Sequence, residues 1–134
     1  MGKLLKDVSM VFSAGAFGGF VNAFLIWILG RWHITQAIGV KLVPDWKPEY
    51  IYPKVVWGGI WGLMFLLPYF TDSIIKRGVI FSLAPTAVVL FYILPVHLGK
   101  GPLGMELGRL LPLFALIVNA AWGIAAAWWL QVTH

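Results

Sequence analysis

The 134-residue chain contains no cysteine and few charged residues, since Asp, Glu, Lys and Arg together make up 11% of it. Without cysteine it has no disulfide framework and no thiolate nucleophile. Soluble domains carry about 25% charged residues, so this chain has too little charge for an ordinary water-exposed surface. Hydrophobic residues make up 60%, eight residues are tryptophan and the mean hydropathy is +0.87. This composition indicates an integral membrane protein and excludes a disordered chain.

The few charges divide the chain into long uncharged stretches. The charged residues at their edges are Asp7, Arg31, Lys54, Asp72, Arg77, Lys100 and Arg109. A membrane-spanning helix needs about 20 apolar residues, and each stretch has a length of that order. The short alternating segments of a membrane β-barrel are absent. We predict one all-α domain, residues 1–134, of four transmembrane helices in a compact antiparallel bundle, with spans near 9–30, 55–71, 77–96 and 108–130.

The only long connection between these spans is residues 31–54. Its first half, residues 34–43, is mostly apolar and predicts a short helix that lies in the membrane interface. Its second half contains Pro44, Pro48 and Pro53, and we expect it to be extended because proline restricts the residue before it.

Positive charges lie on both sides of the predicted membrane segment. Four spans place both termini on one side, with four Lys and Arg residues there and six on the other side. The positive-inside rule gives a slight preference for the long loop facing the cytoplasm. The net charge of +5 is spread over both faces, which indicates contact with anionic lipid headgroups and no nucleic-acid partner. We expect a location in the bacterial cytoplasmic (inner) membrane.

Glycines recur at a spacing of four residues. This spacing puts both glycines on one helix face and lets two backbones approach closely, which matters because lipid provides no hydrophobic drive for helix association. It predicts a compact bundle or an oligomer with tight helix packing. The pairs are Gly15 with Gly19, Gly58 with Gly62, and Gly104 with Gly108.

Pro85 lies in the middle of the third predicted span. A proline there removes a backbone donor and is expected to kink the helix, which frees a carbonyl group near Phe81. The hydroxyl group of Ser82 or Thr86 would satisfy that carbonyl. Such a kink would also shape a cavity between helices.

The central parts of the predicted spans contain no Asp, Glu, Lys or Arg, which counts against a proton-coupled pump. The polar residues placed deepest are Ser13, Asn22, Ser82, Thr86 and Asn119. Such side chains either form hydrogen bonds between helices or line a path for a solute, and the sequence leaves both interpretations open. The bonds would contribute about 0.6 kcal/mol each, up to about 1.7.

His33 and His97 each follow the end of an odd-numbered span and are therefore expected on the same face. Together they would serve as ligands of a haem or a metal. A zinc site normally needs three or four ligands, and no such spacing is present. The simpler interpretation is that both histidines contact water or headgroups, so no cofactor is predicted, and a haem or pigment site is kept as a hypothesis.

No enzyme motif is present, because the chain lacks GxSxG, a P-loop and GxGxxG. We expect a non-enzymatic protein that acts as a structural or accessory subunit of a membrane assembly, or as a homo-oligomer. Its partners would be the lipid bilayer and other membrane subunits or itself. The alternative is a small oligomeric channel or transporter for a small solute or ion, lined by Asn22, Thr86 and Asn119. A third hypothesis is a haem- or pigment-binding membrane subunit.

Overall fold

The computed structural model describes residues 2–70 and 72–133. These residues form helices joined by turns, with no strand among them, so the prediction of an all-α fold is confirmed. Two short elements, η1 and η3, are 3-10 helices, and η2 is a π-helix. The elements are α1 (Gly2–Arg31), α2 (Ile34–Ala37), α3 (Pro48–Gly62), η1 (Leu63–Leu66), α4 (Ile74–Val88), η2 (Val89–His97), η3 (Pro102–Leu107) and α5 (Leu111–Thr133).

Three helices are long and apolar enough to cross a membrane. They are α1, the continuous helix formed by α4 and η2, and α5, with 30, 24 and 23 residues. The predictions of apolar helices near 9–30, 77–96 and 108–130 are confirmed to this extent. The main difference is that α1 begins earlier than predicted, at Gly2.

The helix near the predicted second span lies closer to the N-terminus than expected. α3 begins at Pro48, because the fixed φ and missing N–H of proline suit the first turn of a helix. The prediction of extended chain over residues 48–54 is therefore wrong. After η1 the helix ends at Leu67, which precedes Pro68 and is extended, with φ −74° and ψ 124°. Thr71, the predicted last residue of the span, lies outside the described residues.

The predicted interfacial helix over residues 34–43 is reduced to the four residues of α2. Gly39 has a φ of 77°, a left-handed conformation that ends the helix. The next residue, Val40, is buried in the core, and the Lys41 N–H donates a hydrogen bond of 2.6 Å to the Leu107 carbonyl of η3. The second half of this segment thus packs against the protein.

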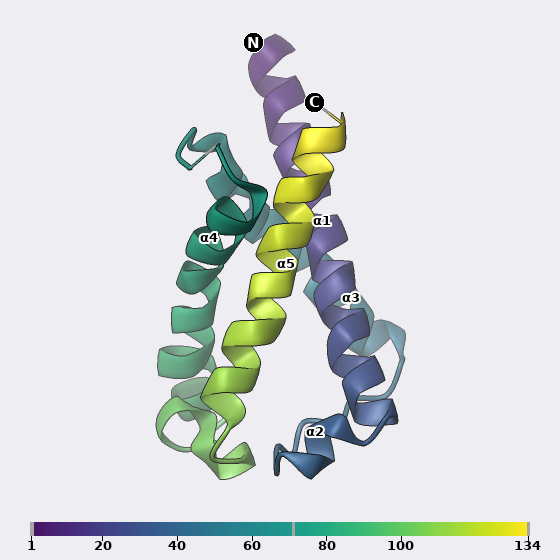
Figure 1. The fold of residues 1–134 in the computed structure, drawn as a ribbon, viewed down its shortest axis with the longest axis vertical. Coiled ribbons are helices and arrows are strands. Elements are labelled where there is room, and N and C mark those ends of the chain that lie inside the picture. Colours follow the sequence, from purple (N-terminus) through teal and green to yellow (C-terminus); the bar gives the residue numbers. More distant parts are fainter. Residues whose placement is uncertain (1, 71, 134) are drawn as a thin grey trace.

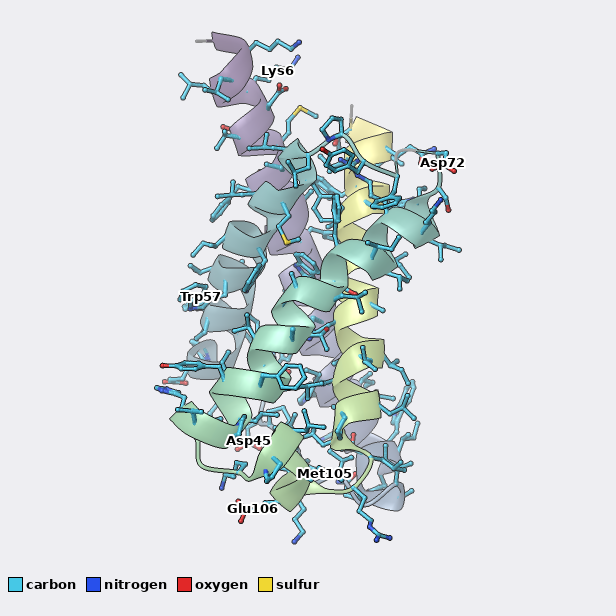
Figure 2. The ribbon with its side chains drawn as sticks, turned by 90° about the vertical axis from the view of Figure 1, so that its left-hand side faces the viewer. Lys6, Asp45, Trp57, Asp72, Met105 and Glu106 are labelled. Atoms are coloured by element: carbon cyan, nitrogen blue, oxygen red, sulfur yellow. The ribbon has the colours of Figure 1, made fainter. Side chains whose placement is uncertain are left out.

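α1 and the α4–η2 helix run in one direction along the molecule, and α3 and α5 run in the opposite direction (Figure 1). α1 packs against both α3 and α5, and α4 packs against α5. The first turn of α1, the last turn of α5 and the turn before α4 lie together at one end, which we call the terminal end. α2 and η3 lie at the opposite end, the loop end. Figure 2 shows Lys6 and Asp72 at the terminal end and Asp45 and Glu106 at the loop end.

Pro85 lies inside α4, which continues through it as an α-helix and widens into the π-helix η2 at Val89. The second proline, Pro95, lies inside η2, where a wider helix reduces the clash of a proline ring with the preceding turn. The two hydroxyl groups expected near Phe81 bond to other carbonyls instead. Ser82 Oγ donates to the Val79 carbonyl and Thr86 Oγ1 donates to the Ser82 carbonyl, each at 2.7 Å.

Buried apolar side chains form two clusters along the length of the molecule. The terminal cluster lies nearer to the terminal end and includes Phe65, Phe81 and Trp122. The loop cluster lies nearer to the loop end and includes Leu94 and Phe114. Both clusters combine residues of α1, α5 and the α4–η2 helix, and α5 packs against both of the others.

Two of the predicted glycine pairs lie where α1 meets α3. Gly15 and Gly19 of α1 face Gly58 and Gly62 of α3. A Cβ atom added at Gly58 would lie 2.6 Å from the Gly15 carbonyl oxygen, which is closer than real Cβ atoms approach. Since neither helix carries a side chain at these positions, the two backbones are in direct contact.

Gly104 and Gly108 do not share a helix face. Gly104 has a φ of 72° within η3, and Gly108 has a φ of 143° just after it. Gly108 also packs against the backbone at Gly39. The spacing of four arises here from turn geometry, since both positions need a conformation that only glycine adopts easily. A different contact, between Gly78 of α4 and Gly123 of α5, brings those two helices together.

We predict that Gly15→Ala destabilises the protein, because the new methyl group would meet the backbone of α3 at Gly58. Overpacking of this kind costs about 1–3 kcal/mol. Thermal unfolding in detergent, followed by circular dichroism, measures the change. Gly2→Ala is the matched control within α1, since a Cβ there meets nothing within 4 Å. Equal unfolding midpoints for the two variants would contradict the close contact.

Candidate functional site

Four polar side chains that the sequence singled out lie together between the two apolar clusters. They are Asn22 of α1, Ser82 and Thr86 of α4, and Asn119 of α5, and we call them the polar layer. Asn22, Ser82 and Thr86 are almost fully buried, with 4%, 1% and 3% of their surfaces exposed. The polar layer therefore lies in the interior, where an unpaired polar group is costly.

Hydrogen bonds connect the polar layer across three helices. Asn22 Nδ2 donates to the Val118 carbonyl of α5 at 2.8 Å and to Asn119 Oδ1 at 3.1 Å. Asn119 Nδ2 in turn donates to Thr86 Oγ1 at 3.0 Å. The Thr86 hydroxyl then donates to the Ser82 carbonyl within α4. Each of these side chains thus uses a donor to bind a neighbour within the protein.

The chemical nature and the position of these side chains limit the reactions in which the polar layer can take part. Neutral amide and hydroxyl groups hold the helices in one register, but they include no acid or base that titrates near neutral pH. Neither of the two cavities described below is lined by any residue of the layer. Its geometry is that of an interhelical clasp.

Two aromatic residues that sequence reasoning did not assign also bond to the backbone of α1. Trp122 Nε1 of α5 donates to the Gly15 carbonyl at 3.1 Å, and the Tyr50 hydroxyl of α3 donates to the Ala23 carbonyl at 2.7 Å. A Trp or Tyr side chain placed inside the protein needs a partner for its polar group. The sequence alone carried no signal for which carbonyl that partner would be.

Both candidate haem ligands are exposed at the loop end. His33 has a φ of 62° and precedes α2, and His97 is the last residue of η2. Among the described residues, no three His, Asp or Glu side chains gather closely enough to hold a metal ion. These positions leave the two histidines accessible to water or headgroups.

An apolar groove of about 760 Å³ runs along α1 beside α5. Trp46, from the loop before α3, covers part of it, with its ring centroid 5.3 Å from that of Trp27 and 5.8 Å from that of Phe20. The Phe20 and Trp46 rings meet edge to face, at 83°, an orientation that aromatic pairs favour. We call this surface the aromatic groove; its aromatic residues are Phe17, Phe20, Phe24, Trp27 and Trp46.

Comparisons of the chain with protein-family models, with curated proteins and with solved structures find no match. Three structural features of the chain bear on its function: the polar layer inside the protein, the backbone contacts between glycines, and the aromatic groove on the outside.

We predict that Asn22 and Asn119 are energetically coupled. Asn22→Leu and Asn119→Leu each remove their shared hydrogen bond, so the double variant should lose less free energy of unfolding than the sum of the single variants. The expected coupling is about 0.6 kcal/mol, and at most about 1.7. Reversible unfolding in mixed detergent micelles measures it. Ser13→Ala, at an exposed position of α1, is the control. Strict additivity would contradict the clasp.

Proposed function

We propose that this chain is a non-enzymatic integral membrane protein that serves as a structural or accessory subunit of a membrane assembly, or associates with copies of itself. In this proposal four helical segments cross the bacterial cytoplasmic membrane, and both termini face the same side. The observation that carries the proposal is the polar layer, in which Asn22, Asn119 and Thr86 bind one another across three helices.

The fourth crossing in this proposal is formed by α3 and η1 together. They contribute 15 and 4 residues, close to the length of about 20 that a span needs. After Lys54 their outer surface is apolar, since Val56, Trp57 and Ile60 are exposed, whereas Glu49 is exposed in the first turn of α3. A surface of this kind is stable against lipid or against another apolar helix, and it is unfavourable in water.

The hydrogen bonds of the interior polar side chains support the structural role. The channel or transporter interpretation assigns Asn22, Thr86 and Asn119 to a solute path. In the described residues these side chains donate hydrogen bonds to each other and to the backbone. A solute would have to break this clasp to pass. The same groups need no rearrangement if their role is to hold three helices together.

The outside of the molecule offers the aromatic groove to a partner. Because the glycine contacts between α1 and α3 lie within the chain, association must use other surfaces. Phe20 and Phe24 remain exposed at 45% and 41%. Large aromatic side chains in a concave apolar surface are typical anchors for a neighbouring helix. We therefore place the contact with a partner subunit, or with a second copy, along this groove.

We predict that native mass spectrometry of gently solubilised membranes detects the chain with a partner protein or with further copies. Phe20→Ala should weaken that association at least about fivefold, since truncation of an interface anchor costs more than about 1 kcal/mol. Phe91→Ala is the matched control, because Phe91 is 69% exposed on η2, outside the groove. A chain that is always recovered as a lone monomer would contradict the proposal.

A further inference from the structure

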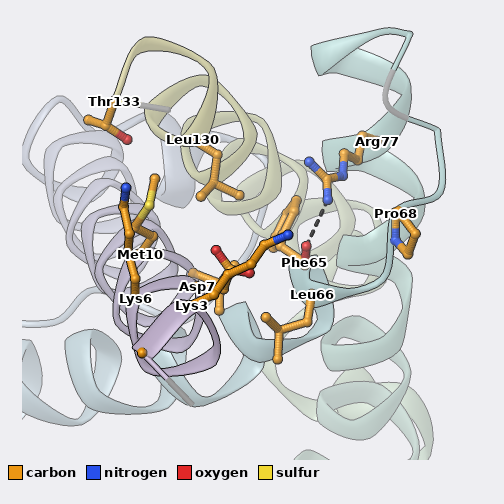
Figure 3. A pocket seen from close by; sticks show the side chains of 12 residues that line it. Lys3, Lys6, Asp7, Met10, Phe65, Leu66, Pro68, Arg77, Leu130 and Thr133 are labelled. Carbon is orange, nitrogen blue, oxygen red and sulfur yellow. Dashed lines mark hydrogen bonds between the residues drawn. The ribbon is translucent and has the colours of Figure 1, made fainter.

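A second cavity, of about 790 Å³, lies at the terminal end between α1, η1, α4 and α5. Its size falls within the range of about 300–1,000 Å³ found for ligand sites. Figure 3 shows Lys3, Lys6 and Asp7 projecting from α1 on one side and Arg77 of α4 on the other. We call it the terminal cavity. None of its charged residues belongs to the polar layer or to the aromatic groove.

The charges of the terminal cavity are unbalanced. Lys3, Lys6 and Arg77 carry three positive charges against the single negative charge of Asp7, which leaves a net charge of +2. Residues 2–70 and 72–133 contain one ion pair, between Lys47 and Asp45, and it lies at the loop end, away from the cavity. In the described residues, none of the cavity's basic groups forms an ion pair with a carboxylate, and an anion placed there would be attracted.

Arg77 is held in place by the protein rather than by an acidic partner. Its Nη2 atom donates to the carbonyl groups of Phe65 and Leu67, at 2.8 and 3.1 Å. The guanidinium group also lies over the rings of Phe65 and Phe81, at 5.1 and 5.7 Å from their centroids. Its Nε atom is buried and has no partner among the described residues. A guanidinium that is held in position by carbonyl groups and keeps its positive charge is well suited to a phosphate group.

Most of the remaining residues that line the cavity are apolar, and Thr133 is the exception. Met10, Leu66 and Leu130 line it between and around the charged groups (Figure 3). The cavity also opens at the ends of the candidate spans α1, α4 and α5, where charged headgroups and acyl chains meet in a bilayer. Basic pockets between membrane helices recognise anionic headgroups. A ligand that carries both a phosphate and an alkyl chain matches the basic and the apolar residues of the cavity, whereas free phosphate matches only the basic ones.

We propose that the terminal cavity binds an anionic phospholipid. Its phosphate group faces Lys3, Lys6 and Arg77, and an acyl chain lies against Leu66 and Leu130. The proposal depends on the membrane location proposed above, but it is independent of the subunit role. Native mass spectrometry distinguishes the two proposals, because a bound lipid and a bound protein partner add different masses to the complex.

The test is native mass spectrometry of the purified full-length chain titrated with phosphatidylglycerol and, separately, with phosphatidylcholine. We expect preferential retention of phosphatidylglycerol. Lys3→Gln/Lys6→Gln should lower its affinity about 25-fold, since each basic group near an anionic lipid contributes about fivefold. Lys41→Gln/Lys100→Gln removes the same charge from exposed sites at the loop end and should leave the affinity unchanged.

Three outcomes would overturn the proposal. Equal retention of the two lipids would mean that no headgroup is recognised. An equal loss of affinity in the loop-end control would mean that overall charge attracts the lipid. Displacement of the lipid by millimolar inorganic phosphate would mean that the cavity holds a free anion without the acyl chain. Circular dichroism spectra that match the unmodified chain confirm that each variant is folded.

Discussion

The close approach of α1 to two neighbouring helices is the contact on which the rest of the arrangement depends. Gly15 and Gly19 bring its backbone against α3, and Gly18 brings it against Trp122 of α5. The Gly15 carbonyl also accepts the hydrogen bond of the Trp122 indole. Dispersion between closely packed backbones is a main source of helix association where the surrounding solvent is apolar. A side chain at any of these positions would separate α1 from a neighbour.

With α1 held in this way, the polar layer becomes possible. Asn22 reaches Asn119 and the Val118 carbonyl only because α1 and α5 lie close enough for bonds near 3 Å. Thr86 joins the network from α4, whose own approach to α5 depends on the contact between Gly78 and Gly123. The steric and polar contacts therefore support each other.

Much of the helical arrangement could be predicted from the sequence, and the predictions that failed have physical causes. Uncharged stretches located the long helices, since burying a charge in lipid is costly. Asn22 and Asn119 were among the five polar residues that the sequence placed deepest, and they bond to each other. The same spacing of four, however, produced a helix contact at Gly15 and Gly19 and a turn at Gly104 and Gly108. Spacing reports a helix face only where the backbone is helical, and the left-handed φ values near residue 104 depend on how η3 packs.

The sequence by itself determined the apolar character of the chain and the approximate extent of three long helices. It also singled out the four residues of the polar layer, together with Ser13, which is exposed. These follow from local composition, because lipid solubility and helix length depend on consecutive residues. Only the tertiary structure decided that Asn119 donates to Thr86, that Trp122 bonds to Gly15, and that Arg77 lines the same cavity as Lys3 and Lys6. Those contacts join residues far apart in the chain, so they depend on how the helices pack.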